Sequence, residues 1–395
     1  MDKDLKSVLG KRNLFIILLA IFICALNGCG GSGGGGGDSG GGSGGTPPTI
    51  ITWAKTYGGN EYDEAHSIQQ TSDGGYIIAG VSNSEILIIK IDAYGNVLWQ
   101  QTHAGEANSI ISSSDGGYII AGQIYPSGIP IGDIGILKLK SNGDIEWNQH
   151  YGIYGGIAND VKQCSDGGYI IVGSGADDIY VIKTYASGNL EWGKNYGGSD
   201  RDIGYSILQT DDGFIIAGET ISTGKVNPEI WIFKIDSSGN IIWEKNFGGS
   251  GYNSAYCIRQ SLDGGFIAAG KKSSAAGDAD IWIAKLKSNG DLDWEKTYGS
   301  SYDEIAYSIQ QTSDGGFIVS GEIKTSAGDT DFLILKLNNN GDLVWQKIYG
   351  GSGDDVARSI QQTADGGYIV AGLTTTDAGD TDFWVLKLDA NGNLN

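Results

Sequence analysis

The sequence predicts an all-β protein built from seven copies of one four-stranded antiparallel unit. One tryptophan per copy recurs at intervals of 45 to 51 residues, and periods of this size are typical of repeat architectures. Short apolar runs alternate with turns rich in Asp, Asn and Gly, as between strands of antiparallel hairpins. Aromatic and β-branched residues, which favour strands, dominate these runs. The recurring residues are Trp53, Trp99, Trp147, Trp192, Trp243, Trp294 and Trp345.

The four strands are clearest in the sixth copy. The first and second are joined by the turn S-D-G-G, and the third and fourth by N-N-N-G-D. In both turns Asp or Asn bonds to nearby backbone and Gly supplies positive φ, so both predict tight hairpins. The second and third strands are almost wholly apolar, which indicates burial on both faces. The predicted strands are Ala306–Thr312, Gly315–Gly321, Asp331–Leu337 and Leu343–Gly350.

Such a unit, repeated seven times, resembles the blade of a β-propeller. The last copy stops at Gly392–Asn395, before its fourth strand, and a spare copy of that strand, Ile51–Tyr57, precedes the first copy. A ring that completes its last blade with the N-terminal strand needs this offset, and closure removes exposed strand edges. An open β-solenoid would not need the offset and would want capping repeats. We therefore expect a seven-bladed propeller over residues 51–395.

The passage Ile91–Trp99 loosely resembles the tryptophan-docking repeat of the quinoprotein (PQQ-type) propellers. In that family too, an Asp–Gly turn precedes a Trp that wedges between blades, although the spacing here is one residue shorter. The resemblance implies a packing role for the Trp. It does not imply the quinone cofactor.

The N-terminus predicts export. A basic segment precedes the apolar run Leu14–Leu26, which at 13 residues is too short to span a bilayer comfortably. This order is that of a signal peptide. The end, Leu26-Asn27-Gly28-Cys29, resembles the bacterial lipoprotein signal, which implies a signal peptide over 1–28 and lipidation of Cys29. The alternative is an ordinary signal peptide cut nearby, which would release a soluble protein.

Residues 29–50 are expected to form a flexible linker that begins at the lipidated Cys29. Of the 17 residues in Gly30–Thr46, 16 are Gly, Ser or Thr, and such a chain cannot bury apolar surface. Its root-mean-square reach is roughly 20–25 Å. By the same resemblance, Gly30 after the Cys implies anchoring at the bacterial outer membrane, on either side of it.

The net charge of −21 excludes some partners. Nucleic-acid binding depends on Lys and Arg, and an anionic membrane surface would repel this chain. The charge favours cations or basic partners, although a solvated acidic surface would give the same composition.

The sequence predicts no catalytic site and no cofactor. The three histidines, His66, His103 and His150, occupy inequivalent places, and no Ser/His/Asp set or phosphate-binding loop can be assembled. Cys164 and Cys257 lack metal-ligand spacing and are interpreted as small core residues.

Acidic residues recur in the connections that would share one face of a propeller. One set starts the first strands: Asp63, Asp202, Asn253, Glu304 and Asp355. The other follows the pattern A-G-D-x-D: Asp278, Asp280, Asp329, Asp331, Asp380 and Asp382. The second set provides candidate calcium ligands, since calcium takes six to eight oxygens, but its spacing matches no known calcium loop. The alternative is that each Asp caps a turn.

The inner strands carry several glutamines and two arginines: Gln69, Gln70, Gln209, Gln310, Gln311, Gln361, Gln362, Arg259 and Arg358. Because strand side chains alternate, half of them should face a central channel. This predicts a polar tunnel, with a small-ligand pocket as the alternative.

Together these features predict a lipid-anchored, monomeric envelope protein. Its role would be binding or scaffolding, with a protein or glycan partner on the acidic loop face. One alternative is a propeller enzyme that acts on polysaccharide or through a quinone. Another is a purely structural surface protein.

Overall fold

The structure is a computed structural model. It describes residues 50–125, 132–221, 224, 226–249, 251–273, 277–376 and 379–394. The chain divides into two units, Met1–Thr49 and Ile50–Asn395. The predicted signal peptide, Cys29 and nearly all of the linker fall in the first unit, outside the described residues. The described part contains no helix that is long and apolar enough to cross a membrane.

The described residues form 27 strands. We assign them to the repeats in chain order, with β5 shared between repeats 1 and 2. Repeats 1 and 2 contain β2 (Asp63–Gln70), β3 (Tyr76–Ser82), β4 (Glu85–Ile91), β5 (Val97–Ser112), β6 (Tyr118–Ile124), β7 (Asp133–Leu139) and β8 (Ile145–Tyr154). Repeat 3 contains β9 (Ile157–Gln163), β10 (Tyr169–Gly175), β11 (Asp178–Thr184) and β12 (Leu190–Tyr196). Repeat 4 contains β13 (Asp202–Thr210), β14 (Gly213–Thr220), β15 (Glu229–Asp236) and β16 (Ile241–Phe247).

The remaining repeats have the same plan. Repeat 5 contains β17 (Asn253–Gln260), β18 (Phe266–Ser273), β19 (Ala279–Leu286) and β20 (Leu292–Tyr298). Repeat 6 contains β21 (Glu304–Gln311), β22 (Phe317–Lys324), β23 (Thr330–Leu337) and β24 (Leu343–Tyr349). Repeat 7 contains β25 (Asp355–Gln362), β26 (Tyr368–Thr375), β27 (Thr381–Leu388) and, from the other end of the unit, β1 (Trp53–Tyr57).

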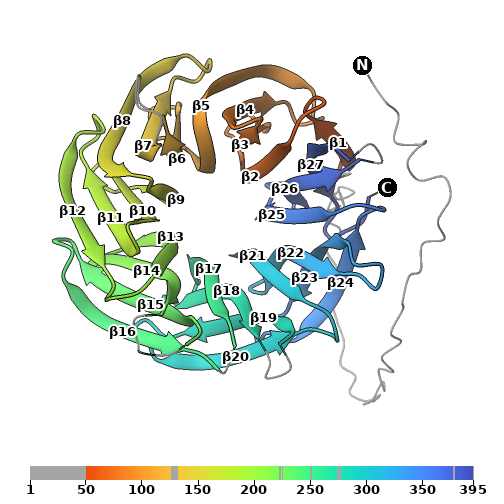
Figure 1. The fold of residues 1–395 in the computed structure, drawn as a ribbon. Helices are drawn as coiled ribbons and strands as arrows, with labels where there is room; N and C mark the ends of the chain where they lie inside the picture. The colour runs from red at the N-terminus through yellow and green to blue at the C-terminus, as the bar shows by residue number, and fades with distance from the viewer. Residues whose placement is uncertain are drawn as a thin grey trace, which may run out of the picture. The chain divides into compact units, whose positions relative to one another are not determined.

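These strands form six antiparallel sheets, five of four strands and one of seven. The seven-stranded sheet arises because β5 is unbroken. Its first half pairs with β4 up to Ala104, and its second half pairs with β6 from Gly105 onward. Gly105 has φ +133, so the chain changes direction there without a separate loop. The sheets are arranged around a common centre, with β9, β13, β17, β21 and β25 innermost (Figure 1).

The predicted strands and the predicted closure are confirmed. All four strands of repeat 6 lie within two or three residues of their expected bounds. At the junction of the two ends, β1 pairs with β27 over the register Trp53↔Lys387 to Tyr57↔Phe383. The N-terminal strand therefore completes the sheet of the last repeat.

One buried lysine per repeat ties the third strand to the first turn. Its ammonium group lies 2.5–3.0 Å from the Asp of the D-G turn, and the Asp carboxylate also accepts backbone N–H bonds within that turn in most repeats. Because the third strands are otherwise apolar, our sequence interpretation overlooked these lysines. The pairs are Lys90–Asp73, Lys138–Asp115, Lys183–Asp166, Lys234–Asp212, Lys285–Asp263, Lys336–Asp314 and Lys387–Asp365.

Each recurring tryptophan packs against the next repeat, as its predicted role requires. Its ring lies over the glycine of the turn between the third and fourth strands of the next repeat, where a Cβ would come within 2.6–3.2 Å of the indole. These glycines also have positive φ, near +80. In most repeats a tyrosine four residues after the Trp donates its hydroxyl to the same glycine's carbonyl, as Tyr57 does to Gly95 at 2.8 Å. The glycines are Gly95, Gly143, Gly188, Gly239, Gly290, Gly341 and Gly392.

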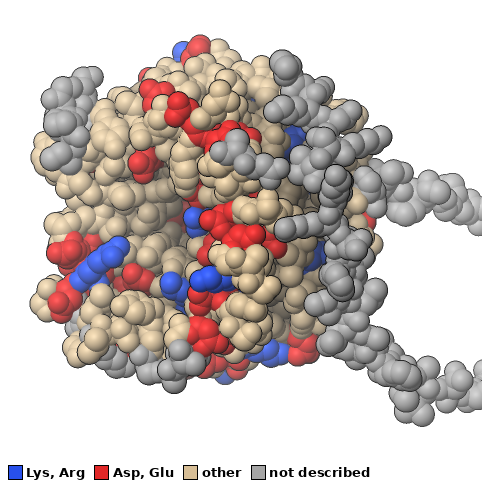
Figure 2. All heavy atoms as spheres, turned by 45° about the vertical axis from the view of Figure 1, so that its right-hand side comes forward, with Lys and Arg blue, Asp and Glu red and all other residues tan. Residues whose placement is uncertain are grey.

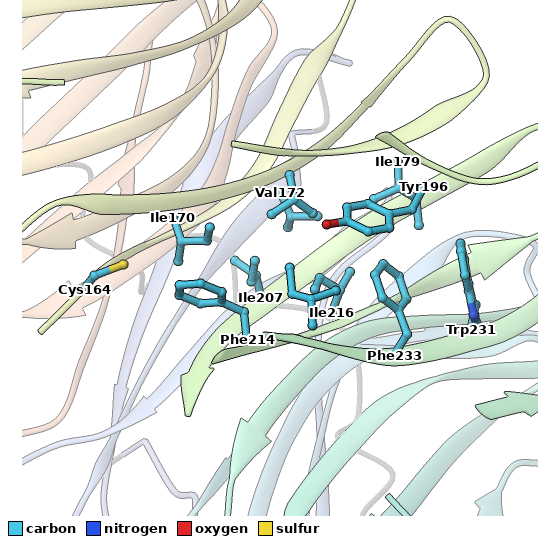
Figure 3. Close-up of a cluster of buried hydrophobic side chains, with 12 residues drawn as sticks. Cys164, Ile170, Val172, Ile179, Tyr196, Ile207, Phe214, Ile216, Trp231 and Phe233 are labelled. Carbon is cyan, nitrogen blue, oxygen red and sulfur yellow. The ribbon is translucent and has the colours of Figure 1, made fainter. Parts of the chain in front are cut away.

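The core consists of apolar layers between neighbouring sheets. Figure 3 shows one layer, in which side chains of repeat 3 such as Ile170 and Val172 face Phe214 and Ile216 of repeat 4. Cys164 lies at the edge of this layer. Both Cys164 and Cys257 are buried free thiols, which confirms their interpretation as core residues, and burial raises the pKa of Cys164 to about 12.

Candidate functional site

The ring has two unlike faces. The connections from second to third strand and from fourth strand to the next repeat lie on one of them, which we call the loop face; Tyr57–Asp63 and Lys324–Thr330 are examples. The short D-G and N-G turns lie on the opposite face, which we call the turn face. Figure 2 shows a hollow in the molecular surface, with Asp and Glu side chains gathered beside it.

The structure brings the two predicted acidic sets together in pairs across neighbouring repeats. The carboxylates of Asp331, at the start of β23, and Asp355, at the start of β25, meet beside Gly350. A Cβ on Gly350 would lie 1.8 Å from Asp331 Oδ1 and 2.8 Å from Asp355 Oδ2. Asp382 and Asp63 converge in the same way on Gly58. Sequence analysis found both sets but did not predict that they meet.

Turn capping accounts for one oxygen of the first-strand carboxylates. Asp63 Oδ2 accepts from the backbone N–H of Gly59 at 2.8 Å, and Asp355 Oδ2 accepts from Gly351 at 2.8 Å. Glu304 accepts equivalently from Ser300. Oδ1 of Asp63, Asp355 and Asp331 is buried and makes no hydrogen bond. Capping is thus confirmed for Asp63, Asp355 and Glu304. In Asp63 and Asp355 the second carboxylate oxygen, Oδ1, is buried and takes no part in the capping.

The Asp331–Asp355 pair has strongly perturbed acidity. Burial first, and then the charge of Asp329, raises the pKa of Asp331 to about 6. Burial raises the pKa of Asp355 to about 7, against opposing hydrogen bonds, and the charges of Asp331 and Asp329 add to the rise. Two carboxylates this close resist double ionisation, so the pair holds a proton near neutral pH.

Two further members of the A-G-D-x-D set, Asp329 and Asp380, cap their own loops. The hydroxyl of Thr325 donates to Asp329 Oδ1, and that of Thr376 donates to Asp380 Oδ1. Asp278 lies on the loop face beside Asp280. Burial is the main cause that raises the pKa of Asp280, and the charge of Asp278 adds to it. Across the described ranges, no group of three or more His, Cys, Asp or Glu side chains could hold a metal ion. Calcium binding by these carboxylates stays a prediction.

A ring of bulge residues crosses all the inner strands. In each repeat the first strand contains an Ala or Gly, and the residue after it forms a β-bulge. The bulge directs the side chain of that residue toward the next repeat. We call these residues the bulge ring: His66, Asn108, Asn159, Tyr205, Tyr256, Tyr307 and Arg358. Our sequence interpretation did not identify it, although its members occupy one position of the repeat.

Contacts around the bulge ring are continuous. His66 Nδ1 lies 2.7 Å from the carbonyl of Ala107, and Asn108 and Asn159 donate to the equivalent carbonyls of the next repeats at 2.9 and 2.8 Å. The three tyrosine rings then contact one another in series, Tyr205 and Tyr256 in a T-shaped pair and Tyr256 and Tyr307 in a tilted one, with centroids 4.7 and 5.4 Å apart.

Arg358 closes the circle. Its guanidinium carbon lies 4.3 Å from the ring centre of Tyr307, and its Nε donates to Glu64 Oε1 at 2.6 Å. Glu64 Oε2 lies 3.5 Å from His66 Nε2. Burial would raise the pKa of Glu64, but His66 and Arg358 outweigh it and hold that pKa well below the usual range. The bulge ring is therefore held together by hydrogen bonds, aromatic contacts and one partly buried ion pair.

The glutamine pairs join neighbouring repeats. Oε1 of the first Gln accepts a backbone N–H from the next inner strand, as Gln69 does from Ser112 at 2.6 Å. Oε1 of the second accepts from the preceding repeat's turn, as Gln362 does from Ser313 at 2.8 Å. Gln69, Gln310, Gln311 and Gln361 also line a polar cavity of about 480 Å³ at the centre.

Comparison with known proteins shows the fold but no family. No protein family and no curated protein matches the sequence. A streptogramin B lyase structure is similar with a TM-score of 0.54 at 13% identity, covering 87% of this chain and 98% of that one. Virginiamycin B lyase from Staphylococcus aureus is similar with a TM-score of 0.52 at 14% identity, covering 86% of this chain and 100% of that one. The Dos1 propeller has a TM-score of 0.52 at 12% identity, covering 83% of this chain and 78% of that one. The second unit of this chain is accordingly an all-β propeller.

Proposed function

We propose that the protein is a binding module of the bacterial envelope that takes a basic partner on its loop face. A groove of about 530 Å³ between the first and last repeats supports this proposal most directly. Asn60, Glu61, Tyr62, Asp380 and Thr381 line it. It combines carboxylates with an aromatic ring that is 52% exposed.

Exposed tyrosines recur in the loops that enter the inner strands. Tyr252 and Tyr302, which precede β17 and β21, are 60% and 41% exposed. Tyrosine is enriched in interfaces because its ring is apolar and its hydroxyl can hydrogen bond. Beside a carboxylate, the ring also attracts cations through its π face. A partner with exposed Lys or Arg side chains would satisfy both features.

The overall charge favours the same partner. A net charge of −21 produces a negative field that attracts basic molecules and accelerates their association at low salt. Among the loop-face carboxylates, Glu61 is exposed and lines the groove. A partner can therefore reach it, whereas the first-strand carboxylates described above are buried.

We infer that the ring has seven blades and that Cys29 anchors it to the outer membrane by lipid. Counting the two halves of β5 as separate strands gives each repeat four strands. The anchor rests on the resemblance of the N-terminus to lipoprotein signals. Labelling of the protein by radioactive palmitate in growing cells, and its loss in Cys29→Ala, would test the anchor. The likeness to quinoprotein propellers is limited to the packing of the Trp residues.

Binding can be tested with variants on opposite faces. The loop-face variant combines Tyr62→Ala, Tyr252→Ala and Tyr302→Ala. The control combines Tyr94→Ala, Tyr185→Ala and Leu262→Ala, which remove side chains that are 58%, 56% and 80% exposed from the turn face. A fluorescent peptide of alternating Lys and Tyr is the probe, and a Glu–Tyr peptide is its counterpart. We expect salt-sensitive binding of the basic peptide that only the loop-face variant loses. Absence of binding by the native protein would contradict the proposal and favour a purely structural role.

A further inference from the structure

The cavity at the centre of the ring differs in charge from the rest of the protein. It lies toward the turn face, between β2, β5, β9, β17, β21 and β25, and has a volume of about 480 Å³. This is within the roughly 300–1,000 Å³ typical of small-ligand sites. Its charged lining residues are Asp160, Lys162 and Arg259, and the others are Ser, Thr, Gln, Ile or Leu. The lining therefore carries one net positive charge in a chain of −21.

Asp160 is fully occupied by the protein. Its Oδ1 accepts from Ser109 Oγ at 3.1 Å, from the Val161 N–H at 2.9 Å and from Lys162 Nζ at 2.5 Å. Its Oδ2 accepts from Ser206 Oγ and from the Ile207 N–H, both at 3.1 Å. A carboxylate with five donors has no capacity for a ligand. Its charge offsets that of Lys162, and Arg259 is left without an acidic partner in direct contact.

Arg259 presents unused donors. The hydrogen bonds of its side chain both come from Nη1, to Ser206 Oγ at 3.3 Å and to the Ile258 carbonyl at 2.9 Å. A guanidinium group has five N–H donors, so Nη2 and Nε retain theirs. Lysine and arginine are also unusual at this position of the repeat. The equivalent residues are Gln69, Ile111, Leu208, Gln310 and Gln361.

The cavity glutamines add donors of fixed orientation. Oε1 of Gln69, Gln310 and Gln361 accepts a backbone N–H at 2.6, 2.7 and 2.7 Å. Only the amide oxygen can accept such a bond, so the hydrogen bond fixes which end of each side-chain amide is the oxygen. The Nε2 group is then at the opposite end and can donate. These three amides line the cavity together with Ser308 and Ser359. The cavity is therefore supplied mainly with hydrogen-bond donors, which suits an anion.

We propose that this cavity binds a small polar molecule that carries one carboxylate, with Arg259 as its principal charged contact. The planar fork of a guanidinium matches a carboxylate in two parallel hydrogen bonds. One net positive charge balances a monoanion, whereas a phosphate dianion would leave a negative charge uncompensated inside an acidic protein. The glutamine amides and serine hydroxyls would contact hydroxyl groups of the same ligand. This site lies on the turn-face side and is independent of the loop-face groove.

The test uses thermal unfolding and calorimetric titration of the full-length protein. The probes are acetate, lactate and glucuronate at millimolar concentration, with glucose and glucose 6-phosphate for comparison, all at matched ionic strength. We expect glucuronate to raise Tm and glucose to leave it unchanged, with a smaller effect of glucose 6-phosphate. Arg259→Gln should weaken glucuronate binding by about tenfold or more. That variant should fold, because Gln occupies the same position in three other repeats.

Lys324→Gln, which removes an exposed charge on the loop face, is the matched control and should bind as the native protein does. The proposal fails if no carboxylate raises Tm, if Arg259→Gln retains native affinity, or if neutral glucose binds as well as glucuronate. Stronger binding of glucose 6-phosphate would replace the carboxylate with a phosphate ligand. Loss of peptide binding on the loop face would leave this result unaffected, so the two proposals can fail separately.

Discussion

Asp331 and Asp355 belong to different repeats, yet both carboxylates lie against Gly350, and each has a buried oxygen without a hydrogen bond. The contact arises because the third strand of one repeat starts beside the first strand of the next. A pair of this kind binds a proton more tightly in the folded than in the unfolded protein. This determines how stability depends on pH.

Asp355→Asn should stabilise the protein at about pH 8 by about 1–3 kcal/mol. The folded pKa of Asp355 is about 7, above its ordinary value, so the folded state binds more protons between about pH 4 and 7. The free energy of unfolding therefore falls as the pH rises through this window, and the variant should lack much of this fall. Asn is tolerated there, since Asn253 holds the equivalent position.

Urea unfolding at several pH values measures this effect, and Glu61→Gln, an exposed carboxylate on the same face, corrects for the loss of one charge. Identical pH profiles for Asp355→Asn and the native protein would show that the pair ionises freely.

Gly341→Ala should destabilise the protein more than Gly315→Ala. Both glycines have φ near +80, so both substitutions strain the backbone by a similar amount, of order 1 kcal/mol. Only at Gly341 would the new Cβ collide, at 2.7 Å from the ring of Trp294, while nothing lies within 4 Å at Gly315. We expect an extra loss of about 1–3 kcal/mol at Gly341. Equal losses in chemical denaturation would mean that the Trp–Gly contact between repeats contributes little.

Lys336→Met should lower the free energy of unfolding by about 1–3 kcal/mol. The ammonium group bonds to Thr312 Oγ1, the Leu337 carbonyl and Asp314, and methionine would leave those acceptors without their donor. The exposed Lys324→Met is the control and should change stability by less than about 0.5 kcal/mol. Thermal or urea unfolding measures the loss of stability in both variants. Similar losses for Lys336→Met and Lys324→Met would show that the buried lysines contribute little to stability.

Calcium should raise the melting temperature only slightly, if at all. Calcium requires six to eight oxygens, and within the described residues no group of three or more acidic side chains is arranged to hold a metal ion. Thermal unfolding in calcium and in chelator measures the difference. A calcium site occupied at 100 times its dissociation constant would add about 2.7 kcal/mol. A shift of that size, lost in Asp331→Asn, would restore the predicted calcium site.

Local patterns made most of the fold predictable. The D-G-G and N-G turns and the apolar runs beside them define each hairpin within about 20 residues. The same turns and runs recur with a period of 45–51 residues, so each repeat could be recognised separately. The unbroken β5 was not predicted, because Ala104–Gly105 carries no turn signature beyond one glycine. The buried lysines left a signal, since Lys recurs at one position in every repeat, but it was hidden within an apolar run.

The candidate sites were harder to predict because their residues meet across repeats. The bulge at Tyr307 depends on backbone register, and its stacking with Arg358 depends on the position of the next strand. Similarly, Lys162 and Arg259 lie 97 positions apart in the chain and become neighbours only when the ring curves around the cavity. Aligning the repeats with one another shows that Lys162 and Arg259 replace the uncharged residues of the other repeats. It does not show that the two side chains line the same cavity.

Binding of the basic Lys–Tyr peptide by the native protein, the loop-face variant and the turn-face variant tests the central claim most directly. The account predicts that the native protein and the turn-face variant bind with equal affinity, that salt weakens both, and that the loop-face variant does not bind. Equal binding by all three proteins, or loss only in the turn-face variant, would contradict a functional loop face.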